Sequence, residues 1–284
     1  MTGLKAAAQM DVGCLRDINE DNAWAQVYHP FGRQPIGLFI VCDGMGGHMG
    51  GEFASYWAVE AIKSEYADLF STKDPRATVV LSEEDIEAAR SGYLLPRLLK
   101  KDKQERVDLE ARVLSAVQKA NQVVHEYALR KPEKAGNAGT TVTMAFIQGN
   151  KAIIANVGDS RTYLLRNHQL RQISQDHSLV ANLVSTGQIL PEDIFTHPQR
   201  NVIYRFLGQK GLVHADIFHE SLRAGDYLLL CSDGLWEMVH SNGIMAEIIE
   251  AADEPAQACQ ELINAANAAG GEDNIGVVVV KVAG

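Results

Sequence analysis

Residues 140–166 read TTVTMAFIQGNKAIIANVGDSRTYLLR, in which three apolar or β-branched runs are separated by QGN and GDS. The runs cover 140–147, 151–157 and 161–166. β-Branched residues favour strands, and the residues between the runs are those that form tight turns. The stretch therefore predicts three successive antiparallel strands joined by hairpins, which places a β-sheet at the centre of the fold.

Helices are predicted in two pairs, one on each side of this stretch. They cover roughly 52–69, 113–127, 242–251 and 254–269. Apolar residues in the first pair step by three and four, as at Val59, Ile62 and Tyr66. In the last helix Asp253 is the predicted cap, and Pro255 lies in the first turn.

Further short apolar runs predict buried strands at 38–42, 226–231 and 274–282. Residues 71–108 are charged and contain two prolines, so we interpret them as a partly helical surface insertion. Strands in the middle of the chain and helices in pairs predict an α+β fold, in which helices cover the outer faces of the sheets.

Composition narrows the class of protein. The 284 residues are 46% hydrophobic, which is enough for a sizeable core. The net charge of −10 argues against a nucleic-acid binder, whose affinity would rest on a basic surface. The four cysteines form no CxxC pair, which disfavours a disulfide framework or a zinc knuckle. No apolar stretch reaches the ~18 residues of a membrane span, and no signal peptide is recognised, so we expect a cytoplasmic protein.

Four aspartates share one pattern, in which an apolar strand adjoins an acid and a small residue or turn. They are Asp43, Asp159, Asp233 and Asp273. One acid at a strand end is ordinarily a turn former. Four acids that converge at one sheet edge would repel one another, and no lysine or arginine recurs beside each of them. A hard divalent cation such as Mg²⁺ or Mn²⁺, which takes carboxylate and carbonyl oxygens, is the natural compensation.

A run of glycines follows the first of these acids, in FIVCDGMGGHMGGEFAS over 39–55. Gly44, directly after Asp43, leaves its backbone carbonyl open to close approach. The run lacks the GK[ST] of a P-loop, and Met49 stands where G-x-G-x-x-G requires its third glycine. A cradle for nucleotide phosphates is therefore disfavoured.

Seven segments together carry a family resemblance. They are RDINEDN, CDGMGGHMGG, AGTTVTMAFI, ANVGDSRTYLLR, SQDHSLV, LLLCSDGLWEMV and GGEDNIGVVVVKV. They resemble, in order, the motifs of the metal-dependent Ser/Thr protein phosphatases of the 2C type, the PPM family, and span about residues 10–282 except for 71–108. The resemblance implies a four-layer α-β-β-α sandwich of two antiparallel sheets flanked by helix pairs. It also implies one catalytic domain over 1–284 that hydrolyses phosphoserine and phosphothreonine in proteins.

The same resemblance implies a binuclear Mn²⁺ or Mg²⁺ site at one edge of the sandwich. Asp43 would bridge two ions, and the Gly44 carbonyl would bind one of them. Asp233 and Asp273 would bind the other.

Other acids would support this site. Asp21 would act mostly through water, with Glu20 beside it. A third, weaker ion is found in many bacterial members and would use Asp159 together with Asp233. Glu237 stands where some relatives have another acid that contributes there.

Arg16 would pair with the substrate phosphate, because a planar guanidinium suits a phosphate dianion. The two metals would lower the pKa of a bridging water and neutralise the phosphoryl oxygens. The resulting hydroxide would attack phosphorus in line, with no phosphoenzyme. Cys42 and Cys231 flank the acids, but neither has the C-x₅-R loop of a cysteine phosphatase, so we interpret both as small buried hydrophobes.

One position departs from the pattern of some members, which have a histidine two residues after the bridging aspartate as the proposed general acid. Here that position is Met45, as in many bacterial members, and His48 lies three residues further on as a candidate supporting residue. The segment 174–212 matches the family's variable flap. Its His177 and His197 are each either a contact to a phosphopeptide or a structural histidine.

The resemblance implies phosphorylated protein substrates and a cognate Ser/Thr kinase whose action is reversed. It also implies a monomer, with neither nucleic acid nor membrane as a partner. Two other classes stay open. A catalytically silent phosphoprotein-binding regulator is disfavoured because the metal acids Asp21, Asp43, Asp159, Asp233 and Asp273 are all present. A metal-dependent nuclease or phosphodiesterase is disfavoured by the acidic charge and by the ordered motifs.

Overall fold

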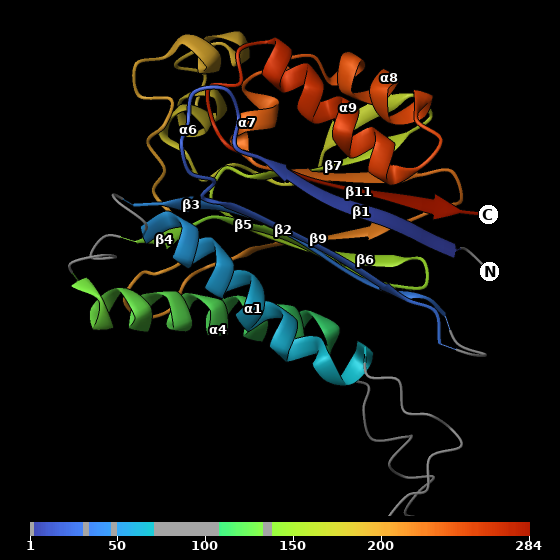
Figure 1. The fold of residues 1–284 in the computed structure, drawn as a ribbon, viewed down its shortest axis with the longest axis horizontal. Coiled ribbons are helices and arrows are strands. Elements are labelled where there is room, and N and C mark those ends of the chain that lie inside the picture. The colour runs from blue at the N-terminus through green and yellow to red at the C-terminus, as the bar shows by residue number, and fades with distance from the viewer. Residues whose placement is uncertain (1–2, 31–33, 47–49, 71–107, 133–137) are drawn as a thin grey trace, which may run out of the picture.

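The computed structural model describes residues 3–30, 34–46, 50–70, 108–132 and 138–284. In this part of the chain two antiparallel β-sheets pack face to face, and a pair of long helices covers the outer face of each sheet (Figure 1). The four layers confirm the α-β-β-α sandwich. Residues 71–107 of the expected insertion lie outside the described residues.

The first sheet contains the first and the last strand of the chain. Its strands lie in the order β1 (Gly3–Asp11), β11 (Ile275–Ala283), β10 (Tyr227–Cys231), β7 (Arg161–Arg166) and β8 (Gln169–Gln172). All neighbours pair antiparallel. Because β11 lies inside the sheet and is covered on both faces, its valine run is buried throughout.

The second sheet has the order β2 (Asp21–Tyr28), β3 (Ile36–Met45), β5 (Val142–Gln148), β6 (Lys151–Val157) and β9 (Asp216–Ser221). The short strand β4 (Gly139–Thr140) pairs with the end of β3. The apolar run in β3 is continuous because alternate residues face different layers. Leu38 and Ile40 pack under the helices, whereas Phe39 and Val41 pack against the first sheet.

The helices α1 (Gly50–Phe70) and α4 (Leu109–Arg130) cover the second sheet, and α8 (Asn242–Ala251) and α9 (Pro255–Ala268) cover the first (Figure 1). Asp108 caps α4 by accepting hydrogen bonds from the backbone N–H groups of Glu110 and Ala111. The predicted Asp253 cap is wrong, because Glu254 occupies the N-cap of α9 and no side chain bonds there. None of the helices among the described residues has the length and apolarity needed to cross a membrane.

The predicted hairpin between β6 and β7 is also wrong. The QGN turn does join β5 to β6 as a hairpin, but GDS carries the chain from the second sheet to the first. Both edges of β6 are already occupied, by β5 and β9, so β7 has no edge of β6 to pair with. At this crossing Gly158 has a φ of +107°, which favours glycine.

The sequence analysis did not predict four of the strands, namely β1, β2, β8 and β9. Each of them is an edge strand of its sheet. Edge strands are half-exposed and carry polar residues, so they lack a continuous apolar run. In β1, for example, Leu4 is the one fully buried residue of GLKAAAQMD.

We predict that Phe39→Ala destabilises the protein by about 3–5 kcal/mol, because the ring is fully buried between the sheets and its removal leaves a cavity. The measurement is the urea midpoint followed by circular dichroism. Leu190→Ala is the control, since its side chain is 59% exposed and should change stability by less than ~0.5 kcal/mol. Equal midpoints for the two variants would contradict this packing.

Candidate active site

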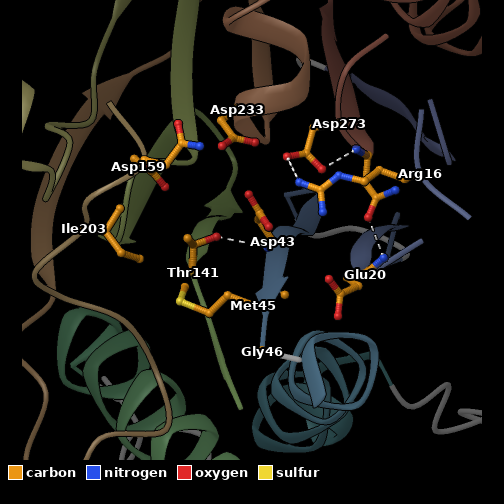
Figure 2. Close-up of a pocket in the computed structure, with 13 residues that line it drawn as sticks. Arg16, Glu20, Asp43, Met45, Gly46, Thr141, Asp159, Ile203, Asp233 and Asp273 are labelled. Atoms are coloured by element: carbon orange, nitrogen blue, oxygen red, sulfur yellow. Dashed lines mark hydrogen bonds and ion pairs between the residues drawn. The ribbon is translucent and has the colours of Figure 1, made fainter. Parts of the chain in front are cut away.

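An open pocket of about 350 Å³ lies at the edge of the sandwich where the two sheets meet (Figure 2). Most of its lining is polar and acidic. The lining residues are Arg16, Glu20, Asp43, Gly44, Met45, Gly46, Thr141, Asp159, Asn201, Ile203, Asp233, Asp273 and Asn274.

The four strand-end aspartates all line this one pocket, although they come from distant parts of the chain. Asp43 lies near the end of β3, and Asp159 lies in the crossing between β6 and β7. Asp233 is the first residue of the short helix α7 (Asp233–Trp236), and Asp273 precedes β11. Figure 2 shows the side chains of Asp43 and Asp233 pointing toward the same space.

The fifth predicted aspartate, Asp21, lies behind the pocket and does not line it. It is opposite Asp43 in the β2–β3 register and is 5% exposed. Ser232 Oγ donates a hydrogen bond to Asp21 Oδ2 at 2.5 Å, and the backbone N–H of Gly276 donates to Ser232 Oγ at 2.8 Å. Asp21 therefore links the second sheet to the first at the base of the site.

Burial is the main reason why these carboxyl groups hold their protons more tightly than usual. It raises the pKa of Asp43 and of Asp159 well above the ordinary value, and the charge of Asp233 raises both further. Burial likewise raises the pKa of Asp233 to about 8 and that of Asp21 to about 7. The charges of Asp273, Glu237 and Asp21 add to the effect of burial at Asp233. The site thus places several acids where full ionisation is unfavourable.

Arg16 is the one positively charged residue in the described lining of the pocket. Its guanidinium NH2 lies 2.7 Å from Asp273 Oδ2, and half of the Arg16 side chain is exposed. Asp273 Oδ1 accepts a hydrogen bond from the backbone N–H of Asn274 at 2.8 Å. Among the described residues, no three acidic, histidine or cysteine side chains converge as a closed set of metal ligands. The acids thus line the pocket, but their carboxylate oxygens do not come together around one position for a metal ion.

Gly44 continues β3 past Asp43, since Gly44 and Met45 pair with Thr140 and Gly139 of β4. A Cβ at Gly44 would overlap the carbonyl oxygen of Gly51 and lie 2.5 Å from that of Glu20. The glycine is therefore required for the close approach of β3 to the start of α1.

The supporting acids lie in different places. Glu20 lines the pocket, and burial raises its pKa. Glu237 follows α7 without lining the pocket; burial raises its pKa, and its Oε2 lies 3.5 Å from Arg200 Nε. Met45 lines the pocket, whereas His48 lies outside the described residues.

The segment 174–212 contributes Asn201 and Ile203 to the pocket wall. It contains the helix α6 (Leu179–Ser185) and the 3₁₀ helix η1 (Pro191–Thr196). Neither of its two candidate histidines lines the pocket. His177 is 2% exposed and accepts a hydrogen bond from the backbone N–H of Gly158 at Nδ1, 3.0 Å away, so it has a structural role. His197 Nδ1 accepts from the backbone N–H of Gln199 at 3.2 Å.

Sequence reasoning missed two polar residues that organise the site. Thr141 Oγ1 accepts a hydrogen bond from the backbone N–H of Asp43 at 3.0 Å. Asn274 holds the Arg16 loop: its Oδ1 accepts from the N–H of Glu20, and its Nδ2 donates to the carbonyls of Val12 and Ile18. Both lie in segments that carry the family resemblance, but a neutral side chain beside an acid gives no separate signal.

Comparisons with known proteins agree with this architecture. A family model described as protein phosphatase 2C matches residues 23–265. The chain is 37% identical over 278 residues to the serine/threonine phosphatase stp of Listeria monocytogenes, which covers 98% of this chain and 96% of that one.

Solved structures are similar over the whole chain. The serine/threonine phosphatase of S. agalactiae superposes with a TM-score of 0.77 at 30% identity, covering 99% of this chain and 100% of that one. The catalytic domain of the phosphatase PstP, solved with two manganese ions, gives a TM-score of 0.74 at 30% identity and full coverage of both chains. By its fold, its ordered motifs and these matches, the chain belongs to the protein phosphatase 2C family of Ser/Thr protein phosphatases.

Proposed function

We propose that this phosphatase hydrolyses phosphoserine and phosphothreonine in proteins with the help of divalent cations held in the acidic pocket. The observation that carries the proposal is that Asp43, Asp159, Asp233 and Asp273 all line one open pocket together with Arg16. Their repulsion calls for a cation, and the arginine provides a partner for the substrate's phosphate.

The donor chemistry of the pocket fits Mn²⁺ or Mg²⁺. Its candidate ligands are carboxylate and carbonyl oxygens, which hard divalent cations prefer, and neither histidine nor cysteine occurs in the described lining. The raised pKa values of Asp43 and Asp233 mean that their negative charges are unfavourable in the metal-free pocket, and bound cations would stabilise these charges. The manganese complex of PstP supports two as the number of ions.

We assign the ligands as the family pattern indicates. Asp43 and the Gly44 carbonyl would hold one ion, and Asp43, Asp233 and Asp273 would hold the other. Asp159 would join Asp233 in a third, weaker site. Among the supporting acids Asp21 and Glu20 lie beside Asp43, and Glu237 follows the helix that begins at Asp233. When bound, the ions supply a nucleophile from water at neutral pH and neutralise charge on the phosphoryl oxygens.

Arg16 binds and orients the phosphate in this proposal. Its exposed guanidinium lies at the pocket and already contacts a carboxylate oxygen of Asp273 at 2.7 Å. The same planar guanidinium would bind a phosphate dianion more strongly than it binds this carboxylate.

Direct hydrolysis by water, with no phosphoenzyme, is supported by the lack of a free hydroxyl or thiol nucleophile in the described lining, whose carboxylates serve as cation ligands in this proposal. Thr141 is the one hydroxyl there, and its Oγ1 is engaged by Ser160 Oγ at 2.6 Å. Cys42 and Cys231 are fully buried, and burial raises the pKa of both thiols. Met45 has no proton to give, so we assign protonation of the leaving alkoxide to water.

We further propose that the chain is a single catalytic domain, monomeric and cytoplasmic, that reverses a Ser/Thr kinase, with 174–212 as a substrate-facing flap. The four cysteines are all free, which suits a reducing compartment. Asn201 and Ile203 give the flap its place in the pocket wall. A silent regulator is the alternative, but the full set of pocket acids favours catalysis.

Removal of the cation should abolish activity. We expect EDTA to eliminate hydrolysis of p-nitrophenyl phosphate and of a phosphothreonine peptide, and Mn²⁺ to restore it. Asp43→Asn should lower kcat/KM at least ~100-fold, because the ions supply several kcal/mol of transition-state stabilisation. Glu247→Gln, on the exposed face of α8, is the charge-matched control. Near-normal activity of Asp43→Asn would refute the proposal, and faster hydrolysis of bis-p-nitrophenyl phosphate than of the monoester would favour a phosphodiesterase.

The metal-free protein should lose stability as the pH rises. The pKa of Asp233 is about 8 in the folded chain, above its ordinary value of 3.8, so the folded state binds more protons between these values. Raising the pH through this range therefore lowers the free energy of unfolding. In EDTA at pH 8 we expect Asp233→Asn to melt at least ~2 °C above wild type, with a smaller difference at pH 5.

Saturating Mn²⁺ should reverse this order, because wild type then gains binding energy that Asp233→Asn lacks. Differential scanning fluorimetry provides the readout. A metal-free Asp233→Asn that melts below wild type at pH 8 would show that this carboxyl is not destabilising in the folded chain.

A further inference from the structure

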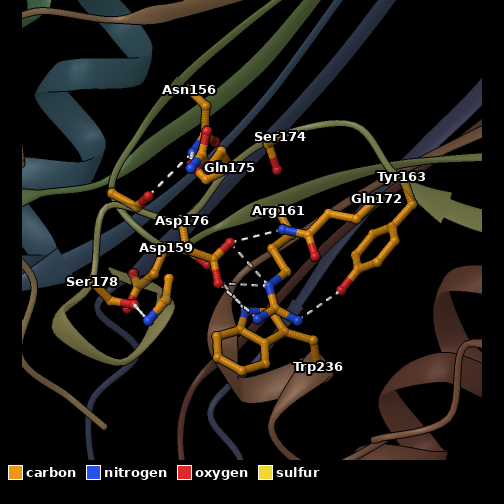
Figure 3. A network of polar contacts seen from close by, with 12 residues as sticks. Asn156, Asp159, Arg161, Tyr163, Gln172, Ser174, Gln175, Asp176, Ser178 and Trp236 are labelled. Atoms are coloured by element: carbon orange, nitrogen blue, oxygen red, sulfur yellow. Dashed lines mark hydrogen bonds and ion pairs between the residues drawn. The ribbon is translucent and has the colours of Figure 1, made fainter. Parts of the chain in front are cut away.

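Arg161, the first residue of β7, lies in a buried polar network beside the pocket (Figure 3). Its Nε lies 3.1 and 3.0 Å from the two carboxylate oxygens of Asp176, and its NH2 lies 2.7 Å from Asp176 Oδ2. The remaining terminal nitrogen donates to the hydroxyl of Tyr163 at 3.2 Å. The Arg161 and Asp176 side chains are 11% and 5% exposed.

The same guanidinium lies over the indole of Trp236, with its central carbon 3.5 Å from the ring centroid. Trp236 is the last residue of α7, the helix that begins with Asp233. Its indole N–H donates to the backbone carbonyl of Asp159 at 3.1 Å. Trp236 therefore contacts one pocket aspartate and shares a single helical turn with another.

Neither of these aspartates is held by a long regular element. Asp159 lies in the sheet-to-sheet crossing, and α7 has four residues and no side-chain N-cap bond. One helical turn does not hold its own conformation, because nucleation costs more than a single hydrogen bond returns. The relative position of Asp159 and Asp233 must therefore come from tertiary contacts. The Arg161 network provides one set of these, in which Trp236 joins the two segments.

We propose that Arg161 is a positioning residue that fixes Asp159 against Asp233 through Trp236, and so sets the affinity of this corner of the pocket for a divalent cation. The proposal rests on the proposed function. It adds a residue that touches neither substrate nor cation, but acts through the helix and the crossing that carry two ligands.

The chain contains a matched control at the other end of the same strand. Arg166, the last residue of β7, makes the same two-fold contact with a buried carboxylate, that of Asp226. Its Nε–Oδ1 distance is 2.9 Å and its NH2–Oδ2 distance is 2.6 Å. Arg166 does not line the pocket, and none of its described bonds reaches a pocket residue. Lysine cannot reproduce the two-fold contact of arginine with a carboxylate, so Arg161→Lys and Arg166→Lys each weaken one arginine–aspartate pair. The Arg166 side chain is 25% exposed, compared with 11% for Arg161.

The experiment compares wild type, Arg161→Lys and Arg166→Lys in Mn²⁺ calorimetry, in phosphopeptide kinetics at saturating Mn²⁺, and in urea unfolding with EDTA. For Arg161→Lys we expect the half-saturating Mn²⁺ concentration to rise ~10-fold or more, which is typical for loss of a residue that orients metal ligands. We expect its kcat to fall with KM changed less than ~2-fold. Arg166→Lys should keep the Mn²⁺ affinity and kcat within ~2-fold of wild type, although it also weakens an ion pair with a buried aspartate.

A second variant guards against a folding defect. Trp236→Phe keeps a flat ring under the guanidinium but removes the N–H that reaches Asp159, and should also weaken Mn²⁺ binding. Two results would overturn the positioning role while leaving the proposed function intact. One is wild-type Mn²⁺ affinity in both Arg161→Lys and Trp236→Phe. The other is an equal loss of Mn²⁺ affinity and kcat in Arg161→Lys and Arg166→Lys. A wild-type protein that neither binds Mn²⁺ nor hydrolyses the phosphopeptide would overturn both.

Discussion

The burial of several aspartate carboxylates at one edge of the sandwich is the constraint on which the rest of the structure depends. The β2–β3 register sets Asp43 opposite Asp21, and the ends of two other elements bring Asp159 and Asp233 to the same pocket. Like charges in a poorly solvated setting raise one another's energy. Protons relieve this repulsion at low pH, and in our account divalent cations relieve it at neutral pH. The charge repulsion thus destabilises the metal-free chain, and in our account the same charges bind the cations that the reaction requires.

The scaffold around these acids is correspondingly stiff. Thr141 Oγ1 and Ser160 Oγ lie 2.6 Å apart across the two sheets, as do the hydroxyls of Thr143 and Thr162. The Ser232–Asp21 bond adds a third link between the sheets close to the pocket. Buried polar bonds of this kind are costly to leave unmade, so they fix one arrangement of the two sheets. The pocket edge is therefore held from both sides, although its acids come from loops and element ends.

Local signals predicted an α+β fold with helix-covered sheets, the central strands and the four pocket aspartates, whereas the four-layer sandwich followed from the family resemblance. A continuous apolar run marks β3 and β11, and an acid that ends such a run stands out. The crossing from β6 to β7 carries no such signal, since GDS reads equally well as a hairpin turn. The edge strands were missed because their residues are half-exposed. Long-range pairs such as Arg161 with Asp176 are fixed by tertiary packing, which no spacing rule records.

The central claim is that the uncompensated charge of the pocket is a cation site. Anomalous diffraction at the manganese absorption edge tests it most directly, on crystals of the wild-type protein grown with MnCl₂ near pH 7.5. The account predicts two strong anomalous peaks within coordination distance of Asp43, with carboxylate oxygens of Asp233 and Asp273 around one of them. A pocket without anomalous density at saturating Mn²⁺ would contradict it.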